Sequence, residues 1–223
     1  MTEVYFFGIT IIGFTLPLFA LRMGREWLIG LLPIVLITGN VFAQAFVQVG
    51  GVLTSLAVPV YAMTFLITDL LAEHYGRRDA LRAVWVGFMG QVVFLAVMLV
   101  VLWAPVLPPY GDNYANALST VPRLVLGSFI AYLVSQNLDV RLYDTIRNLT
   151  GEKHMWIRNN VSTMISQAVD TGIFLFIAFW GVPPFADPAV WLNFALFTWV
   201  FKIVVAAIDT PYMYLSRSIV RRS

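Results

Sequence analysis

Two opposite charges stand inside apolar runs in the C-terminal part of the chain. Asp170 lies near the middle of the apolar segment 159–181, and Lys202 lies near the middle of the next one, 191–213. An ionisable side chain at mid-bilayer costs about 2.5–3.5 kcal/mol on insertion scales, so its presence requires a reason. Consecutive membrane helices run in opposite directions, which brings these two side chains to a matching depth. The sequence therefore predicts an Asp170–Lys202 pair that lines a polar cavity or forms a purely structural ion pair.

Other polar side chains recur at helical spacing within apolar segments. Asn159, Thr163, Ser166 and Gln167 share one helical stripe with Asp170. Three earlier segments carry comparable sets, namely Asn40, Gln44 and Gln48; Thr54, Tyr61, Thr64, Thr68 and Asp69; and Ser128, Tyr132, Ser135, Gln136 and Asp139. Because lipid does not face polar stripes, such a bundle encloses a polar cavity. The alternative is that the hydroxyls bond only to their own helix, and that Asp69 and Asp139 reach interfacial water.

The composition explains where these residues must lie. Of 223 residues, 60% are apolar and 12% are charged, and the mean hydropathy is +0.81. Soluble domains average about 45–50% apolar and about 25% charged residues. The chain contains no Cys, which excludes disulfides and thiolate chemistry. Neither metal-ligand spacing nor a nucleophile–base set is legible, so we expect no cofactor and no enzyme. We expect an all-α integral membrane protein.

Seven apolar segments are long enough to cross a hydrocarbon core of about 30 Å. They are 4–21, 27–46, 52–72, 83–103, 119–138, 159–181 and 191–213. Tight turns are expected at Gly50-Gly51, Pro108-Pro109 and Pro183-Pro184. The first segment has no basic residue before it, which favours a retained helix over a cleaved signal.

The basic residues indicate the orientation. Twelve of the 14 Lys and Arg residues fall beside alternate segment ends, all on one side of a seven-span arrangement. They are Arg22, Arg25, Arg77, Arg78, Arg82, Arg141, Arg147, Lys153, Arg158, Arg217, Arg221 and Arg222. Basic residues are retained on the cytoplasmic side, so the N-terminus is expected outside and the C-terminus in the cytoplasm. Because they lie in short loops, they do not indicate nucleic-acid binding.

Four motifs in order resemble the queuosine precursor transporter family of vitamin-uptake-transporter-like membrane proteins. They are Thr68-Asp69-x-x-x-Glu73-x-Tyr75-Gly76, Ser135-Gln136-x-x-Asp139, Arg158-Asn159-x-x-Ser162-Thr163-x-x-Ser166-Gln167-x-x-Asp170, and Lys202 followed by Thr210-Pro211. The resemblance implies a six-helix core, at about residues 27–215, similar to the substrate-binding subunits of energy-coupling-factor vitamin transporters. The helix at about 4–21 would be an addition, and residues 1–223 would form one multi-pass domain in the bacterial cell membrane.

The resemblance also implies uptake of a 7-deazaguanine base, a precursor of queuosine in tRNA. Such a base offers N–H donors to a carboxylate, a carbonyl to Lys, Asn or Gln, and a flat face to an aromatic ring. We expect its binding residues among Asn40, Gln44, Tyr61, Asp69, Gln136, Asp139, Asn159, Gln167, Asp170 and Lys202.

Two alternatives to this function stay open. One is uptake of another small vitamin-like molecule. The other is a retinal-binding seven-helix photoreceptor, which the Lys in the last segment would suit, although the middle of the third segment lacks a carboxylate counter-ion. The sequence leaves open the exact substrate, the energy source or coupling partner, and whether the protein forms a homo-oligomer.

Overall fold

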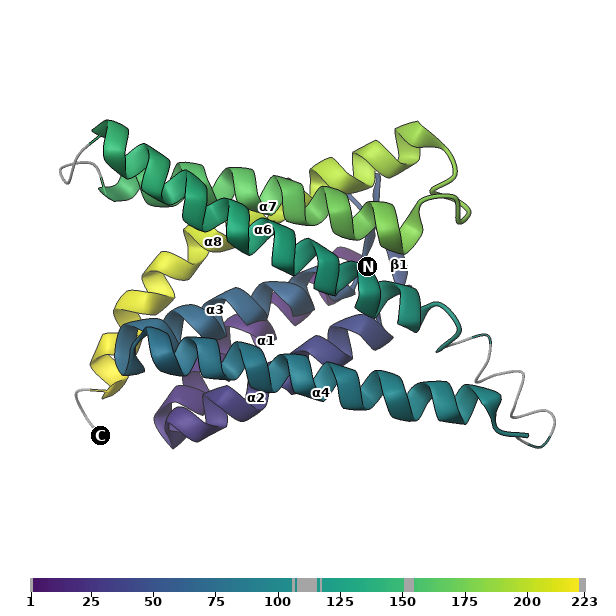
Figure 1. Ribbon diagram of the computed structural model, residues 1–223, viewed down its shortest axis with the longest axis horizontal. Helices are drawn as coiled ribbons and strands as arrows, with labels where there is room; N and C mark the ends of the chain where they lie inside the picture. The colour runs from purple at the N-terminus through teal and green to yellow at the C-terminus, as the bar shows by residue number, and fades with distance from the viewer. Residues whose placement is uncertain (1, 106, 108–115, 117, 151–154, 221–223) are drawn as a thin grey trace. The chain divides into compact units, whose positions relative to one another are not determined.

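The computed structural model describes residues 2–105, 107, 116, 118–150 and 155–220, which are mostly helical (Figure 1). In chain order the elements are α1 (Thr2–Met23), α2 (Arg25–Val41), β1 (Phe46–Val49), β2 (Val52–Ser55), α3 (Ala57–Tyr75), α4 (Arg77–Trp103), α6 (Val121–Thr150), α7 (Met155–Phe179) and α8 (Pro188–Val220). Each predicted apolar segment overlaps one of these helices. Residues 1–122 with 204–223 form a first compact unit, and residues 123–203 form a second unit.

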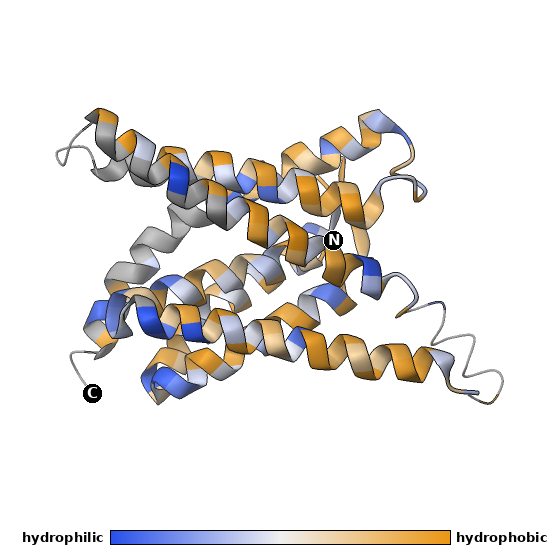
Figure 2. Cartoon of the chain, viewed as in Figure 1, coloured by the Kyte–Doolittle hydropathy of each residue, from blue (hydrophilic) through white to orange (hydrophobic). Residues whose placement is uncertain are grey.

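Within the part of the chain that the structure describes, two helices are long and apolar enough to cross a membrane by length and composition, Thr2–Met23 and Arg78–Trp103. Shorter apolar stretches run through Val121–Ser135, Met164–Phe179 and Pro188–Val204. Figure 2 shows α4 apolar along most of its length, with hydrophilic residues at its start. Val97 and Val100 of α4 are 58% and 67% exposed, a large apolar surface that suits lipid better than water.

The core of the first unit is built around α3. This helix packs against α1, α2 and α4, and α2 also packs against α4. Leu66, Ile67, Leu70 and Leu71 on α3 are fully buried. Glycine allows the close approach of α2 and α4, because a Cβ at Gly90 would lie 2.9 Å from Cβ of Pro33.

The connection between α2 and α3 is a β-hairpin, so the prediction of an all-helical chain is wrong for these residues. Strands β1 and β2 pair antiparallel, with Val49 opposite Val52. The predicted turn at Gly50-Gly51 is confirmed, with φ of +57° and +80°, the left-handed values that a two-residue hairpin loop requires. The predicted segments 27–46 and 52–72 therefore extend too far into this connection, since α2 ends at Val41 and α3 begins at Ala57.

The second unit contains most of α6, α7 and the first half of α8. Side chains of α8 bond to α7 at two levels: the indole N–H of Trp191 donates to the carbonyl of Leu175 at 3.2 Å, and that of Trp199 donates to the carbonyl of Met164 at 3.0 Å. Arg123 on α6 donates to the carbonyls of Ile177 and Trp180, at the end of α7. The prediction of one domain over residues 1–223 stays a prediction.

Candidate functional site

The second unit contains the predicted pair of opposite charges. Lys202 Nζ donates to Asp170 Oδ2 at 2.8 Å, and the two side chains are 11% and 21% exposed. Ser135 Oγ of α6 donates to the other carboxylate oxygen, Asp170 Oδ1, at 3.1 Å. Both oxygens of Asp170 are thus bonded, and three helices contribute to the cluster. We call Ser135, Asp170 and Lys202 the charged cluster.

Polar side chains surround the charged cluster inside the second unit. Ser162, Ser166 and Thr171 of α7 and Thr198 of α8 are all at least 95% buried. Helices of a membrane protein turn such groups away from lipid, so their burial agrees with the polar stripe predicted for this segment. Gln167 lies one turn before Thr171, and its Oε1 atom is buried without a hydrogen-bond partner. An unpaired buried acceptor is a group that a ligand can satisfy.

The first unit holds a second polar arrangement, which we call the amide network. Asn40 of α2 is fully buried; it accepts a hydrogen bond from the Tyr61 hydroxyl and donates one to Oε1 of Gln91. The ring of Tyr61 packs on Gly39, where a Cβ would lie 3.0 Å from the ring. The three hydrogen-bonded residues come from three helices: Asn40 from α2, Tyr61 from α3 and Gln91 from α4. The network therefore fixes the relative rotation of these helices.

Sequence reasoning missed Gln91 of α4, which is 4% exposed. In the sequence, Gln91 is an isolated carboxamide in the apolar segment 83–103, and no polar stripe surrounds it. A lone amide at such a depth is satisfied by a polar group on a neighbouring helix, and here that group is Asn40.

The remaining predicted site residues are placed as follows. Gln44 lies just after α2 and donates to the hydroxyl of Thr120. Asp69 lies on α3 and is exposed. Gln136, Asp139 and Asn159 have side chains outside the described residues. The structure therefore brings Asn40 together with Tyr61, and Asp170 together with Lys202.

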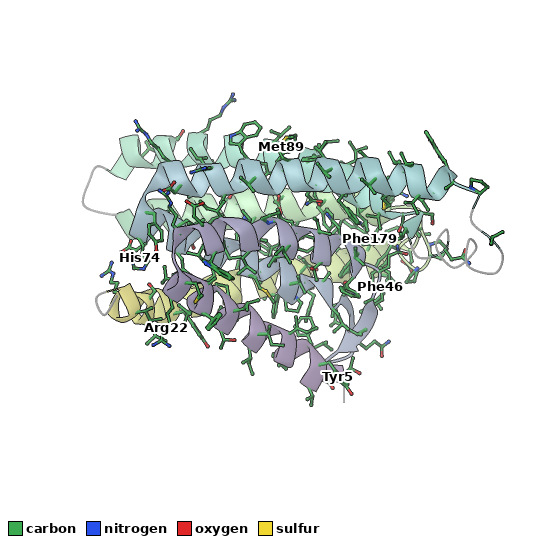
Figure 3. The ribbon with its side chains drawn as sticks, turned by 90° about the horizontal axis from the view of Figure 1, so that it is seen from below. Tyr5, Arg22, Phe46, His74, Met89 and Phe179 are labelled. Carbon is green, nitrogen blue, oxygen red and sulfur yellow. The ribbon has the colours of Figure 1, made fainter. Side chains whose placement is uncertain are left out.

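Charged groups of the first unit gather at helix ends rather than in the interior. Arg217, near the end of α8, pairs with Glu73 at the end of α3 at 2.7 Å. Arg25 at the start of α2 pairs with Asp79 at the start of α4 at 3.3 Å. Figure 3 shows Arg22 and His74 toward one end of this unit, and Tyr5 and Phe46 toward the other. Among the described residues, no group of three or more His, Asp or Glu side chains could hold a metal ion.

Comparison with known proteins places the chain in a family. A family model described as "Putative vitamin uptake transporter" matches residues 55–216. The chain is 36% identical over 189 residues to the "Probable queuosine precursor transporter" of Bacillus subtilis, covering 82% of this chain and 80% of the relative. It is 26% identical over 181 residues to the "Queuosine precursor transporter" of Escherichia coli, covering 81% and 80%. No solved structure matches the chain. The matched region contains all four sequence motifs, and the chain belongs to the vitamin uptake transporter family of membrane proteins.

Proposed function

We propose that the protein imports a 7-deazaguanine precursor of queuosine across the cell membrane for tRNA modification. The observation that carries this proposal is the similarity to two relatives named as queuosine precursor transporters, over about four-fifths of each chain. Membership of a transporter family also leaves the photoreceptor alternative without support. Uptake of a different vitamin-like molecule is the second candidate, because the family description names vitamins.

The two polar arrangements supply groups that suit such a base. The lactam edge of a deazaguanine presents N–H donors and a carbonyl, which complement the carboxylate of Asp170, the acceptor of Gln167 and the ammonium of Lys202. In the first unit, Asn40 offers a carboxamide and Tyr61 an aromatic face. We propose Gln167, Asp170 and Lys202 as the principal substrate-binding groups of the second unit, and Asn40 and Tyr61 as candidates in the first unit. Gln44, Asp69, Gln136, Asp139 and Asn159 are further candidates.

Recognition through hydrogen bonds predicts sharp discrimination between bases. Adenine lacks the N1–H donor and the 2-amino group of a guanine, and it replaces the carbonyl with an amino group. A buried polar group left unpaired costs about 1–3 kcal/mol, so two mismatches weaken binding by roughly 100-fold. In membrane vesicles that take up radiolabelled 7-cyano-7-deazaguanine, we expect 7-aminomethyl-7-deazaguanine and guanine to compete, and adenine to compete about 100-fold more weakly.

Vesicles without the protein provide the background for this measurement. Equal competition by adenine would contradict recognition of the base edge. If biotin or riboflavin competes better than every base, the result favours the second candidate function, uptake of a different vitamin-like molecule. Neither result depends on which residues form the site, so the assay tests the function before any variant is made.

We propose that the N-terminus lies outside and the C-terminus in the cytoplasm. The ion pairs of Arg25 and Arg217 lie at helix ends, and Figure 3 shows Arg22 and His74 at one end of the first unit. Because the chain has no Cys, single cysteines give a clean test. An impermeant maleimide should label Ser119→Cys and Pro183→Cys in intact cells, and Arg78→Cys and Lys153→Cys only after permeabilisation. The reverse pattern would contradict the orientation.

A further inference from the structure

Two buried hydroxyls of the second unit have no hydrogen-bond partner. Thr171 of α7 is 1% exposed and Thr198 of α8 is 5% exposed, and the Oγ1 atom of each is unpaired. A hydroxyl buried without a partner destabilises the folded protein. Such groups are rare in folded proteins, and each requires an explanation.

Other threonines in the described helices satisfy their hydroxyls locally. Thr10, Thr38 and Thr145 each donate to the carbonyl four residues earlier, at 2.9, 2.7 and 2.8 Å. Every residue inside a helix has this carbonyl within reach, and a threonine uses it by adopting the appropriate side-chain rotamer. Thr171 and Thr198 lie inside helices and do not use it. Their hydroxyls therefore make no hydrogen bond to the backbone of their own helix.

The two hydroxyls lie at the level of the charged cluster. Trp191 with Leu175, Trp199 with Met164, and Lys202 with Asp170 set the register of the antiparallel helices α7 and α8. Thr171 follows Asp170 directly, and Thr198 lies one turn before Lys202. With a rise of 1.5 Å per residue, both threonines stand within about one helical turn of the ion pair.

Gln167 belongs to the same group of unpaired atoms. It lies four residues before Thr171 and so shares its face of α7. Its buried Oε1 atom is an acceptor without a donor. By contrast, both carboxylate oxygens of Asp170 are already bonded, to Lys202 and to Ser135. At this level of the second unit, the buried side-chain atoms without any hydrogen-bond partner therefore belong to neutral groups.

We propose that Gln167, Thr171 and Thr198 form a neutral binding patch that recognises the lactam edge of an uncharged heterocyclic base. Gln167 accepts from a ring N–H, and the threonine hydroxyls donate to or accept from the neighbouring carbonyl and amino groups. The Asp170–Lys202 pair joins the two helices that present the patch, and its charged groups lie at the same level. This inference rests on the proposed function and names the groups that determine its specificity.

Thr171→Val and Thr198→Val test the proposal, because valine keeps the shape of threonine and removes only the hydroxyl. In the absence of substrate, the purified variants should melt at or above the temperature of the wild type, since an unpaired buried hydroxyl has been removed. Each variant should nevertheless raise the KM for uptake of 7-cyano-7-deazaguanine by about 10-fold. Thr198→Ser, which retains a hydroxyl, should keep a KM near that of the wild type.

Thr10→Val is the matched control, because this threonine is already bonded to the carbonyl of Phe6. It should leave KM unchanged. An unchanged KM in both Thr171→Val and Thr198→Val, with uptake by the wild type intact, would overturn this inference and leave the proposed function standing. If a valine variant does not accumulate, the alanine variant at that position is compared with the serine variant, and equal KM values would overturn the inference. Absence of uptake by the wild type would overturn the proposed function and the inference with it.

Discussion

Lys202→Met should reduce uptake by at least about 100-fold while folded protein remains in the membrane. Methionine has nearly the length of lysine without its charge, so Asp170 would keep only its bond to Ser135. Breaking one side of a buried ion pair costs about 3–5 kcal/mol, because the remaining charge loses its compensation. Asp170→Asn should have a similar effect, since it removes the negative charge that pairs with the ammonium of Lys202. Uptake in vesicles, normalised to the amount of protein, measures both.

The double variant Lys202→Met/Asp170→Asn separates transport from stability. It removes both charges, so the melting temperature should recover toward that of the wild type, whereas uptake should not. Recovery of uptake in the double variant would assign the ion pair a purely structural role. Full uptake by both single variants would place the pair outside the transport mechanism.

Hydropathy alone located the helices but not the connection between α2 and α3. Val47, Val49, Val52 and Leu53 are apolar, and they extend the neighbouring helical segments without a visible break except at Gly50-Gly51. The β-branched side chains of the three valines favour strands, a preference that a hydropathy window does not register. The opposite error occurs in α6, which continues to Thr150, beyond the predicted end of its apolar segment at residue 138. There the chain stays helical although its residues become polar.

The candidate site was predictable where placing a charged side chain inside the membrane costs so much free energy that it requires a partner or a function. Asp170 and Lys202 fall in this class, and the structure joins them at 2.8 Å. Gln91 was missed because one carboxamide in an apolar segment has no partner visible in the sequence. Thr171 and Thr198 were missed for a different reason. Membrane helices contain many hydroxyls, and only the structure shows which of them forgo the carbonyl of their own helix.

Asn40→Leu should destabilise the first unit more than any substitution of an exposed residue. Asn40 is the centre of the amide network, so its loss removes the donor to Gln91 Oε1 and the acceptor of the Tyr61 hydroxyl. Losing one hydrogen bond costs a buried polar group about 1–3 kcal/mol, so the losses at Gln91 and at the part-buried Tyr61 hydroxyl together give about 2–6 kcal/mol. Folded domains are stable by only about 5–15 kcal/mol, so this is a large fraction of the total. Thermal melting of the purified protein, followed with and without substrate, measures the loss.

The triple variant Asn40→Leu/Gln91→Leu/Tyr61→Phe distinguishes a structural role of the amide network from a role in substrate binding. It replaces every polar atom of the network with apolar groups of similar size, and removing all partners together is nearly neutral for stability. The melting temperature should therefore recover, and a network that only fixes the rotation of its helices would recover uptake as well. We expect uptake to stay well below that of the wild type, because the carboxamide of Asn40 is proposed to bind the base. Full uptake by the triple variant would contradict a substrate-binding role for Asn40 and Tyr61. The charged cluster and Gln167 would then be the foremost of the remaining candidates with described side chains.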